Sequence, residues 1–353
     1  MLRRSHVPFA ELTSLRVGGP ADSLAEPVTT DELRAVVVGR DDDGAGLLVI
    51  GAGTNLVVSD DGFDGLVVRV ATRGRRVVER DGDELVVSLA AGEPLDELAA
   101  ASVAAGWSGL EALSGVPGTV GAAPVQNVGA YGQEISSVVR GVQVLDRATG
   151  DVRELGAAQC RFGYRTSVLK ANPRFVVLTV TLSLTRGAAR PIRYAELARA
   201  LGVAAGARPP LGEVRAAVLE LRAAKGMLAP TGPPACGAGV PDGAMPASAG
   251  SFFTNPLLRA DLADRLPAAA PRWPAGDGLV KVPAAWLIEH AGFPRGYGEG
   301  PARLSTRHAL AIVNTGGART ADVLDLARRI RAGVREAFGV VLSPEPTLVG
   351  CAL

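Results

Sequence analysis

Residues 47–58 read LLVIGAGTNLVV, an apolar run, a glycine-rich turn and a second apolar run. Short apolar runs bounded by glycine predict two buried strands. Glycines in such a turn let backbone N–H groups approach an anion, so a pyrophosphate could be held by Gly51, Ala52, Gly53, Thr54 and Asn55. A tight turn between strands explains the same residues without a ligand. Because the sixth position is Leu56 and a strand follows, the stretch is not the Rossmann fingerprint.

The rest of the chain predicts a mixture of strands and helices. A helix is expected after an N-cap at Thr30, and further helices over 93–106, 195–201, 213–224, from about Pro256, 283–291 and 320–337. Strands are expected over 66–70, 175–184 and 309–313, with hairpins over 75–90, turning at Asp81-Gly82, and over 142–155. The Pro/Gly-rich residues 229–249 predict a flexible loop, and the main domain boundary is expected near residue 210.

Length, charge and cysteine content limit the class of protein. A chain of 353 residues predicts two or three packed domains, and a formal net charge of +1 argues against nucleic acid or an anionic membrane as partner. Cys160, Cys236 and Cys351 are too few and too far apart for a disulfide framework or a zinc site. With no apolar stretch suited to a signal peptide or a membrane span, a cytoplasmic protein is expected.

A second glycine-rich stretch, residues 114–132 (SGVPGTVGAAPVQNVGAYG), has neither helical nor strand periodicity. Long loops of mixed composition inside compact domains tend to be functional. Glycines would let the backbone lie against a flat ring system, whose edges Gln126 and Asn127 could recognise. A structural connector remains the alternative.

Three further motifs carry single chemical groups. Arg165 in CRFGYR presents a planar fork that suits a carboxylate, although a surface arginine would look the same. Ser251 in GSFFTNP lacks the GxSxG context of a hydrolase and could be a turn or capping serine that precedes a helix. Glu345 lies between two prolines, which restrict the local backbone, or is simply a terminal surface carboxylate. His6, His290 and His308 are too scattered for a metal cluster, so no metal is expected.

Taken together and in order, these motifs resemble the UDP-N-acetylenolpyruvoylglucosamine reductase family. The likeness runs from Thr13 to Gly350 through TSLRVGGPA (13–21), GAGTN (51–55), PGTVGAAPVQNVGAYGQE (117–134), CRFGYR (160–165), GSFFTNP (250–256), KVPAAWLIEHAG (281–292), HALAIVN (308–314) and SPEPTLVG (343–350). One departure is the segment between Lys225 and Ser251, which is longer and richer in proline and glycine than is usual for the family.

The resemblance implies an α+β fold. It comprises an FAD-binding domain of the vanillyl-alcohol-oxidase (PCMH) type over 1–208, with subdomains of about 1–70 and 71–208, a substrate-binding domain over 209–340, and a tail over 341–353 that returns to the FAD site. Non-covalent FAD would be held by Gly51, Ala52, Gly53, Thr54, Asn55, Leu56, Gly118, Thr119, Gly121, Ala122, Gln126, Asn127, Gly129 and Tyr131.

The implied reaction is the reduction of UDP-N-acetylglucosamine enolpyruvate to UDP-N-acetylmuramate, with NADPH as hydride donor, in peptidoglycan synthesis and hence in cell shape and division. Arg165 and Glu345 would stabilise the charge that develops on the substrate carboxylate, and Ser251 would protonate the α-carbon. For Glu345 this role requires a carboxyl group that stays protonated. The substrate contacts implied are Tyr194, Lys225, Asn255 and His308. A monomer is expected.

Three other classes compete with this interpretation. A flavin oxidase of the same fold often attaches FAD through a histidine in the glycine-rich segment, and no histidine lies between His6 and His290. A Rossmann dehydrogenase lacks support because no helix is expected after the GAGTN turn. A non-catalytic nucleotide-sugar binding protein would be expected to lack one of the three reactive groups, all of which are present.

Overall fold

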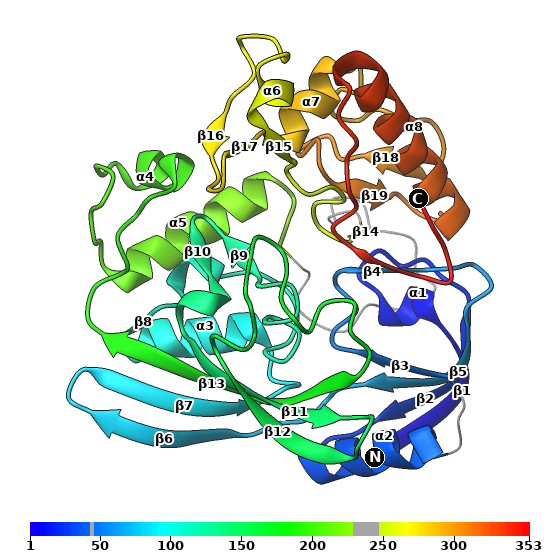
Figure 1. The fold of residues 1–353 in the computed structure, drawn as a ribbon, viewed down its shortest axis with the longest axis vertical. Coiled ribbons are helices and arrows are strands. Elements are labelled where there is room, and N and C mark those ends of the chain that lie inside the picture. Colours follow the sequence, from blue (N-terminus) through cyan, green and yellow to red (C-terminus); the bar gives the residue numbers. More distant parts are fainter. Residues whose placement is uncertain (43–45, 229–246) are drawn as a thin grey trace. The chain divides into compact units, whose positions relative to one another are not determined.

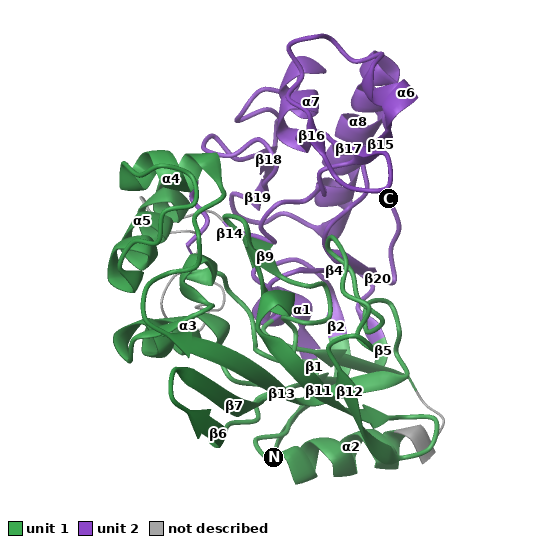
Figure 2. Ribbon diagram, turned by 60° about the vertical axis from the view of Figure 1, so that its left-hand side comes forward, with its two compact units in different colours: residues 1–6, 21–52, 64–224 green, residues 7–20, 53–63, 225–353 purple. Residues whose placement is uncertain are grey.

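The computed structural model describes residues 1–42, 46–228 and 247–353, which form two compact units. Unit 1 comprises residues 1–6, 21–52 and 64–224, and unit 2 comprises residues 7–20, 53–63 and 225–353 (Figure 2). The GAGTN turn lies at their border in sequence, with Gly51 and Ala52 in unit 1 and Gly53 to Asn55 in unit 2. Cys236 and most of the predicted 229–249 loop lie outside the described residues.

A four-stranded sheet opens the chain. Its order is β1 (Leu2–Pro8), β2 (Pro20–Glu26), β5 (Phe63–Arg69) and β3 (Leu47–Ile50), and β3 pairs with β5 in parallel. Helix α2 (Thr30–Asp42) buries Leu33 and Val37 in the core that these strands share. The hydroxyl of Thr29 accepts the Glu32 N–H at 3.1 Å, so Thr29 caps this helix and the predicted cap at Thr30 is wrong by one residue.

The larger sheet of unit 1 is antiparallel. Its order is β12 (Asp151–Gly156), β11 (Val139–Asp146), β13 (Phe175–Arg186), β7 (Glu84–Ala90) and β6 (Arg75–Asp81), and β8 (Trp107–Ser108) pairs with β13. Both predicted hairpins are present. Asp81 pairs with Glu84, so the β6–β7 turn is Gly82-Asp83, one residue later than predicted. Helix α3 (Leu95–Ala104) lies over this sheet (Figure 1) and buries Leu95 and Leu98.

Short elements and two helices complete unit 1. They are η1 (Glu111–Leu113), β9 (Gly129–Ala130), β10 (Gln133–Glu134), η2 (Ile135–Ser137), α4 (Ala195–Leu201) and α5 (Leu211–Ala224). Leu197 of α4 and Val214 and Val218 of α5 are buried in one apolar cluster. Helix α5 follows the boundary expected near residue 210, yet it packs within unit 1.

Unit 2 contains the 19-residue helix α8 (Thr320–Phe338), which buries one face in the core of the unit. Its other elements are α1 (Phe9–Leu12), β4 (Leu56–Val58), β14 (Ala247–Ser248), β15 (Leu257–Arg259), α6 (Ala260–Ala263), β16 (Trp273–Pro274), β17 (Leu279–Lys281), α7 (Ala284–His290), β18 (Ala302–Leu304), β19 (Ile312–Asn314) and β20 (Thr347–Val349). The sheets run β14-β19-β18, β15-β17-β16 and β20-β4, the last pair being parallel. Leu15 and Val57 belong to the same core as Ile330, which explains why residues 7–20 and 53–63 group with this unit.

The helix predicted from about Pro256 is wrong. Residues 257–259 form strand β15, which pairs antiparallel with β17, and only the four-residue helix α6 follows. The cause is non-local, because the pairing partner lies some twenty residues further along the chain. Within the described residues, no helix combines the length and the apolar character needed to cross a membrane.

Candidate active site

The two glycine-rich segments predicted to hold the cofactor meet in unit 1. A Cβ atom added to Gly51 would lie 2.7 Å from Oγ1 of Thr119 and 3.3 Å from Cβ of Ala122. A Cβ atom on Gly121 would lie 2.4 Å from Cβ of Ala91. Neither position can hold a side chain without a shift of its neighbours, which are side-chain atoms of Thr119 and Ala122 at Gly51 and the backbone of Ala91 at Gly121.

The loop that carries these residues is rigidly held and suits a flat ligand. Its backbone is fastened by hydrogen bonds from the Val120 N–H to the Glu93 oxygen at 2.8 Å and from the Gly121 N–H to the Ala91 oxygen at 2.8 Å. Most of residues 114–124 are buried, whereas Ala122 is exposed. A fixed backbone that presents only a methyl group fits the ring system of a flavin. The residues present therefore fit the cofactor that the sequence implies.

Arg165 occupies a tight turn in the same unit. The N–H and oxygen of Gly163 bond with the oxygen and N–H of Thr166 at 3.0 and 3.3 Å, which leaves Tyr164 and Arg165 at the tip. Arg165 has a φ of +54°, in the left-handed region that non-glycine residues rarely adopt. Its Nη2 donates to the oxygen of Gly129 at 2.9 Å, which brings the arginine motif to the end of the glycine-rich loop.

Asn127 links the loop to this turn. Its Nδ2 donates to Oε2 of Glu134 at 2.8 Å and to the oxygen of Gly163 at 3.0 Å, and its Oδ1 accepts the Ser136 N–H at 3.1 Å. The residue is only 1% exposed. The amide predicted to recognise a ring edge thus makes three bonds inside the protein. Gln126, its neighbour in the sequence, is half-buried in the loop.

Two tyrosines stand near the same end of the loop as Gly129. The ring of Tyr131 meets that of Tyr194 edge to face, with 5.7 Å between the centroids. Burial raises the pKa of the Tyr131 phenol to about 12, with the nearby Arg222 acting in the opposite direction. Burial also raises the pKa of Tyr194, so both hydroxyls are neutral donors near pH 7. Gly118, with a φ of +126°, lies at the start of the same loop.

A cavity of about 220 Å³ adjoins Tyr131. Its charged lining residues are Glu111, Glu134, Arg190 and Arg193, none of which the sequence analysis had selected. The run RPIRY, in which two arginines precede Tyr194, is a signal that could have drawn attention to this wall.

In unit 2 the serine motif pairs with the chain's C-terminal segment. The Glu345 N–H donates to the oxygen of Phe252 at 2.8 Å, and Phe253 forms an isolated antiparallel bridge with Pro344. On its other side, Phe252 donates its N–H to the oxygen of Leu310 at 2.7 Å. Glu345 therefore pairs with Phe252, the residue that follows Ser251.

Asn55 joins the GAGTN turn to this pairing. Its Nδ2 donates to the Glu345 oxygen at 3.2 Å, and its own oxygen accepts the Thr347 N–H at 3.0 Å. Strand β20 then runs parallel to β4, which places Leu56 opposite Thr347. Ser14 is a further link that the sequence analysis missed, because its hydroxyl lies 3.3 Å from the Thr54 oxygen and 2.7 Å from the Ser248 oxygen.

The predicted substrate contacts have different surroundings. Oγ of Ser251 lies 3.4 Å from Nε2 of His308. The side-chain oxygen of Asn255 accepts the Ala284 N–H at 2.9 Å and so caps the first turn of α7. Lys225 directly follows α5 and is half-buried.

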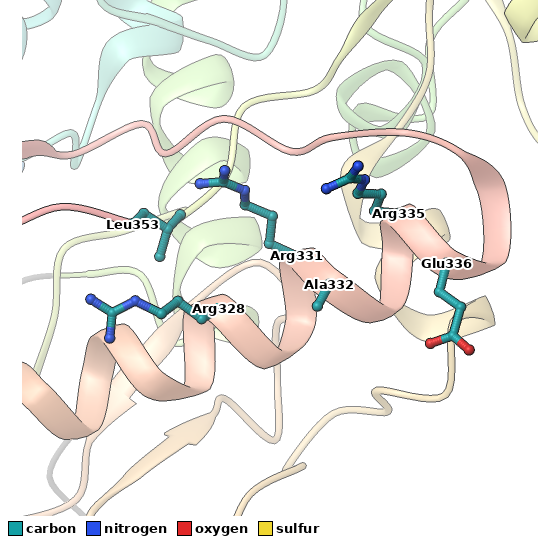
Figure 3. Close-up of a pocket in the computed structure, with 6 residues that line it drawn as sticks. All are labelled: Arg328, Arg331, Ala332, Arg335, Glu336 and Leu353. Carbon is teal, nitrogen blue, oxygen red and sulfur yellow. The ribbon is translucent and has the colours of Figure 1, made fainter.

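One depression of unit 2 is lined by none of these motifs. Arg328, Arg331 and Arg335 lie along α8 beside Leu353 and line a depression of about 450 Å³ (Figure 3). Arg328 already donates to Asp325 and to the Ala352 oxygen, both at 2.8 Å. Across the ranges that the structure describes, no group of His, Cys, Asp and Glu side chains is arranged to hold a metal ion.

The predicted catalytic residues thus divide between the units, with Arg165 in unit 1 and Ser251 and Glu345 in unit 2. Known families match both parts of the chain. Residues 21–156 match the model of an FAD binding domain, and residues 242–349 match that of the C-terminal domain of UDP-N-acetylenolpyruvoylglucosamine reductase.

Full-length relatives agree with these matches. The chain is 49% identical over 359 aligned positions to the UDP-N-acetylenolpyruvoylglucosamine reductase of Thermobifida fusca, covering 99% of this chain and 98% of that one. It is 50% identical to the protein of the same name from Streptomyces coelicolor, covering 98% and 90%. The crystal structure of the MurB reductase from Thermus caldophilus superposes with a TM-score of 0.64 at 28% identity, covering 99% of this chain and 98% of that one. The α+β fold predicted from the sequence is confirmed, and the chain belongs to the UDP-N-acetylenolpyruvoylglucosamine reductase family.

Proposed function

We propose that this protein is an FAD-dependent reductase that converts UDP-N-acetylglucosamine enolpyruvate to UDP-N-acetylmuramate in peptidoglycan synthesis, with NADPH as the reductant. The observation that carries the proposal is the backbone pairing of the serine motif with the C-terminal segment, which joins Glu345 to Phe252, the residue after Ser251. A proton donor beside a carboxyl group suits the addition of a hydride and a proton across an activated double bond. Family membership supports the same reaction and disfavours a flavin oxidase.

Arg165 would stabilise the charge that develops during the reaction. When a hydride reaches the β-carbon of the enolpyruvyl group, negative charge builds on the substrate carboxylate as an enediolate. A guanidinium group is always charged and can pair with both carboxylate oxygens. Interactions that strengthen as this charge develops lower the barrier most. The bond from Arg165 to the Gly129 oxygen holds the guanidinium before substrate arrives.

Ser251 and Glu345 would complete the reaction on the substrate. The α-carbon of an enediolate is strongly basic, so a positioned hydroxyl can protonate it although serine is a weak acid in water. Glu345 would donate a hydrogen bond to the same carboxylate when its own carboxyl group is protonated. Both residues are half-buried, which limits the access of water to the reacting atoms.

FAD supplies the hydride when bound, and Gly51, Thr119 and Ala122 would hold it where the two glycine-rich segments meet. The other cofactor contacts implied by the sequence, from Gly53 to Leu56 and from Gly118 to Tyr131, stay part of the proposal except Asn127, whose side chain makes three hydrogen bonds inside the protein. The functional division into an FAD domain over 1–208, a substrate domain over 209–340 and a returning tail over 341–353 is likewise proposed. Tyr194, Lys225, Asn255 and His308 are the proposed contacts to the UDP-sugar, with Asn255 acting through the helix that it caps.

The first experiment tests the cofactor and the reaction together. The purified protein should take up FAD, release it on acid denaturation, and oxidise NADPH rapidly only when the enolpyruvyl substrate is present. A protein that takes up no FAD, or that oxidises NADPH equally well without substrate, would remove the proposal. Comparing initial rates with NADPH and NADH tests the proposed reductant.

The second experiment tests the proton donor. Ser251→Ala should leave flavin reduction by NADPH close to the wild-type rate and slow flavin reoxidation by substrate by about 10²–10⁴-fold, the usual contribution of a general acid. Ser343→Ala is the matched control, because Ser343 is exposed and contributes its main-chain oxygen to the pairing with Thr254. Equal losses in both half-reactions would show that Ser251 has a structural role. The expected monomer and cytoplasmic location stay predictions, the former open to light scattering.

A further inference from the structure

The position of Arg165 depends on a turn whose backbone conformation is unfavourable without contacts from the surrounding structure. The turn has only two residues between Gly163 and Thr166, and Arg165 at its tip has a φ of +54°. A left-handed conformation is unfavourable for a residue that has a Cβ atom. Such conformations persist where the surrounding structure determines them, and they cluster at functional sites. The contacts that hold this turn therefore decide where the guanidinium points.

Asn127 provides a side-chain contact at the base of the turn. Its Nδ2 donates to the oxygen of Gly163 at 3.0 Å, and that same oxygen accepts the Thr166 N–H that closes the turn. At the tip, Lys170 donates from Nζ to the Arg165 oxygen at 2.9 Å. The guanidinium itself bonds to Gly129, two residues after Asn127. Asn127 thus holds the start of the turn, and it belongs to the same segment as Gly129, which accepts the hydrogen bond from the Arg165 side chain.

The orientation of the Asn127 amide follows from its neighbours. Two acceptors, the Glu134 carboxylate and the Gly163 oxygen, lie beside one terminal atom of the side-chain amide. One donor, the Ser136 N–H, lies beside the other terminal atom. The amino group must therefore face the two acceptors. Asn127 has a φ of +47°, a conformation that asparagine adopts more readily than most residues, and it is 1% exposed. Its side chain has one arrangement, and Glu134 keeps it there.

We propose that Asn127, held by Glu134, is a positioning residue for Arg165 that acts through the 163–166 turn and not through contact with the flavin. The inference rests on the proposed role of Arg165 in stabilising the substrate carboxylate. It assigns Asn127 and Glu134 to the half-reaction with substrate, although Asn127 lies in the loop that the sequence assigns to the cofactor.

Asn127→Asp is the test, because it keeps the size of the side chain and replaces the amino group by an oxygen. Two hydrogen bonds are lost, and the new oxygen faces the Glu134 carboxylate across a contact that was 2.8 Å. The expected result is reoxidation of reduced flavin by substrate slowed by about 100-fold, the effect of a displacement of about 1 Å, with flavin reduction by NADPH within about twofold of wild type. The flavin absorbance spectrum should be unchanged.

Asn172→Asp is the matched control in the same unit. Its Nδ2 donates to the Val168 oxygen at 3.2 Å and its Oδ1 accepts the Arg174 N–H at 3.2 Å, so the substitution disturbs a similar turn that lies outside the proposed site. Both half-reactions should keep their wild-type rates in this variant. The inference is overturned if Asn127→Asp slows both half-reactions by the same factor, shifts the flavin spectrum, or leaves reoxidation within about threefold of wild type.

A double variant keeps the test decisive if Asn127→Asp does not load FAD. In Asn127→Asp with Glu134→Gln, the glutamine amide can donate to the new carboxylate, which restores that contact, while the Gly163 oxygen still lacks its donor. FAD loading should recover and reoxidation should stay slow; recovery of both would overturn the inference. The variant Arg165→Ala distinguishes failure of the proposed role of Arg165 from failure of the positioning role of Asn127. If it reoxidises at the wild-type rate, the proposed role of Arg165 fails; if it is slow while Asn127→Asp is fast, only the positioning role fails.

Discussion

Gly53 offers a test of how closely unit 2 is packed beneath the GAGTN turn. Its φ is +65°, and a Cβ atom added there would lie 1.9 Å from the backbone oxygen of Leu12. Gly339, which ends α8 in the same unit, has a φ of +67°, and its Cβ would meet only Cδ1 of Leu262, at 4.0 Å. The two glycines share the left-handed conformation and differ in the space around them. Their alanine variants therefore separate backbone strain from steric overlap.

The expected losses follow from these distances. Gly339→Ala should cost about 1 kcal/mol, the strain of a left-handed alanine. Gly53→Ala carries the same strain, and the Leu12 oxygen must also retreat from 1.9 Å to at least 3.0 Å. A backbone atom cannot rotate away, so an overpacking cost of about 1–3 kcal/mol is added. Because the Gly53 oxygen accepts the Ser14 N–H at 3.1 Å, that bond should weaken too.

Thermal unfolding of the FAD-free variants, monitored by circular dichroism, measures the difference in stability between Gly53→Ala and Gly339→Ala. Gly53→Ala should melt below Gly339→Ala by roughly 2–4 °C for each kcal/mol of added cost. FAD titration of the same samples should show weaker binding for Gly53→Ala alone. Equal melting temperatures for the two variants would refute the reasoning, because they would show that the Leu12 contact relaxes at no cost.

Two further predictions concern hydrogen bonds to carboxylates. Asp60 accepts the N–H groups of Thr320 and Ala321 at 2.8 and 3.0 Å, so Asp60→Ala should destabilise α8 by about 1–2 kcal/mol in urea unfolding, whereas Asp61→Ala should not. Burial raises the pKa of Asp96, but hydrogen bonds from Arg215 and the Gly115 N–H outweigh it and lower that pKa below its usual 3.8. A lowered pKa adds stability above pH 3.8 that is lost as the pH falls through the folded-state pKa. The gap in melting temperature between wild type and Asp96→Asn should therefore be constant near neutrality and narrow in acid; a gap independent of pH would contradict the assignment.

Local sequence patterns predicted the helices well where the apolar residues repeat. The helix expected over 195–201 is α4, and that expected over 320–337 is α8, one residue longer. Periodicity and capping are properties of neighbouring residues, so they can be recognised without the fold. The prediction from Pro256 was wrong because β15 exists only through its pairing with β17.

Local sequence patterns could not predict which residues belong to which of the two units. Residues 7–20 and 53–63 are distant in sequence from most of unit 2, and they join it because Leu15, Val17 and Val57 are buried in its core. Helix α5 joins unit 1 because Val214 and Val218 pack with Leu197. Whether an apolar side chain is buried is visible in the sequence, but the core that buries it depends on contacts between distant residues.

The sequence by itself determined the family, and it predicted Arg165, Ser251 and Glu345 as the reactive groups from the order of short motifs around them. The tertiary structure alone decided which of these groups are neighbours and what holds them. The serine motif meets the C-terminal segment through a bond from the Glu345 N–H to the Phe252 oxygen, across more than ninety residues, and the bond from Asn127 to Gly163 joins two motifs that the sequence keeps apart. A hydrogen bond requires two atoms within about 3 Å. Only the folded chain brings residues so distant in sequence to that separation.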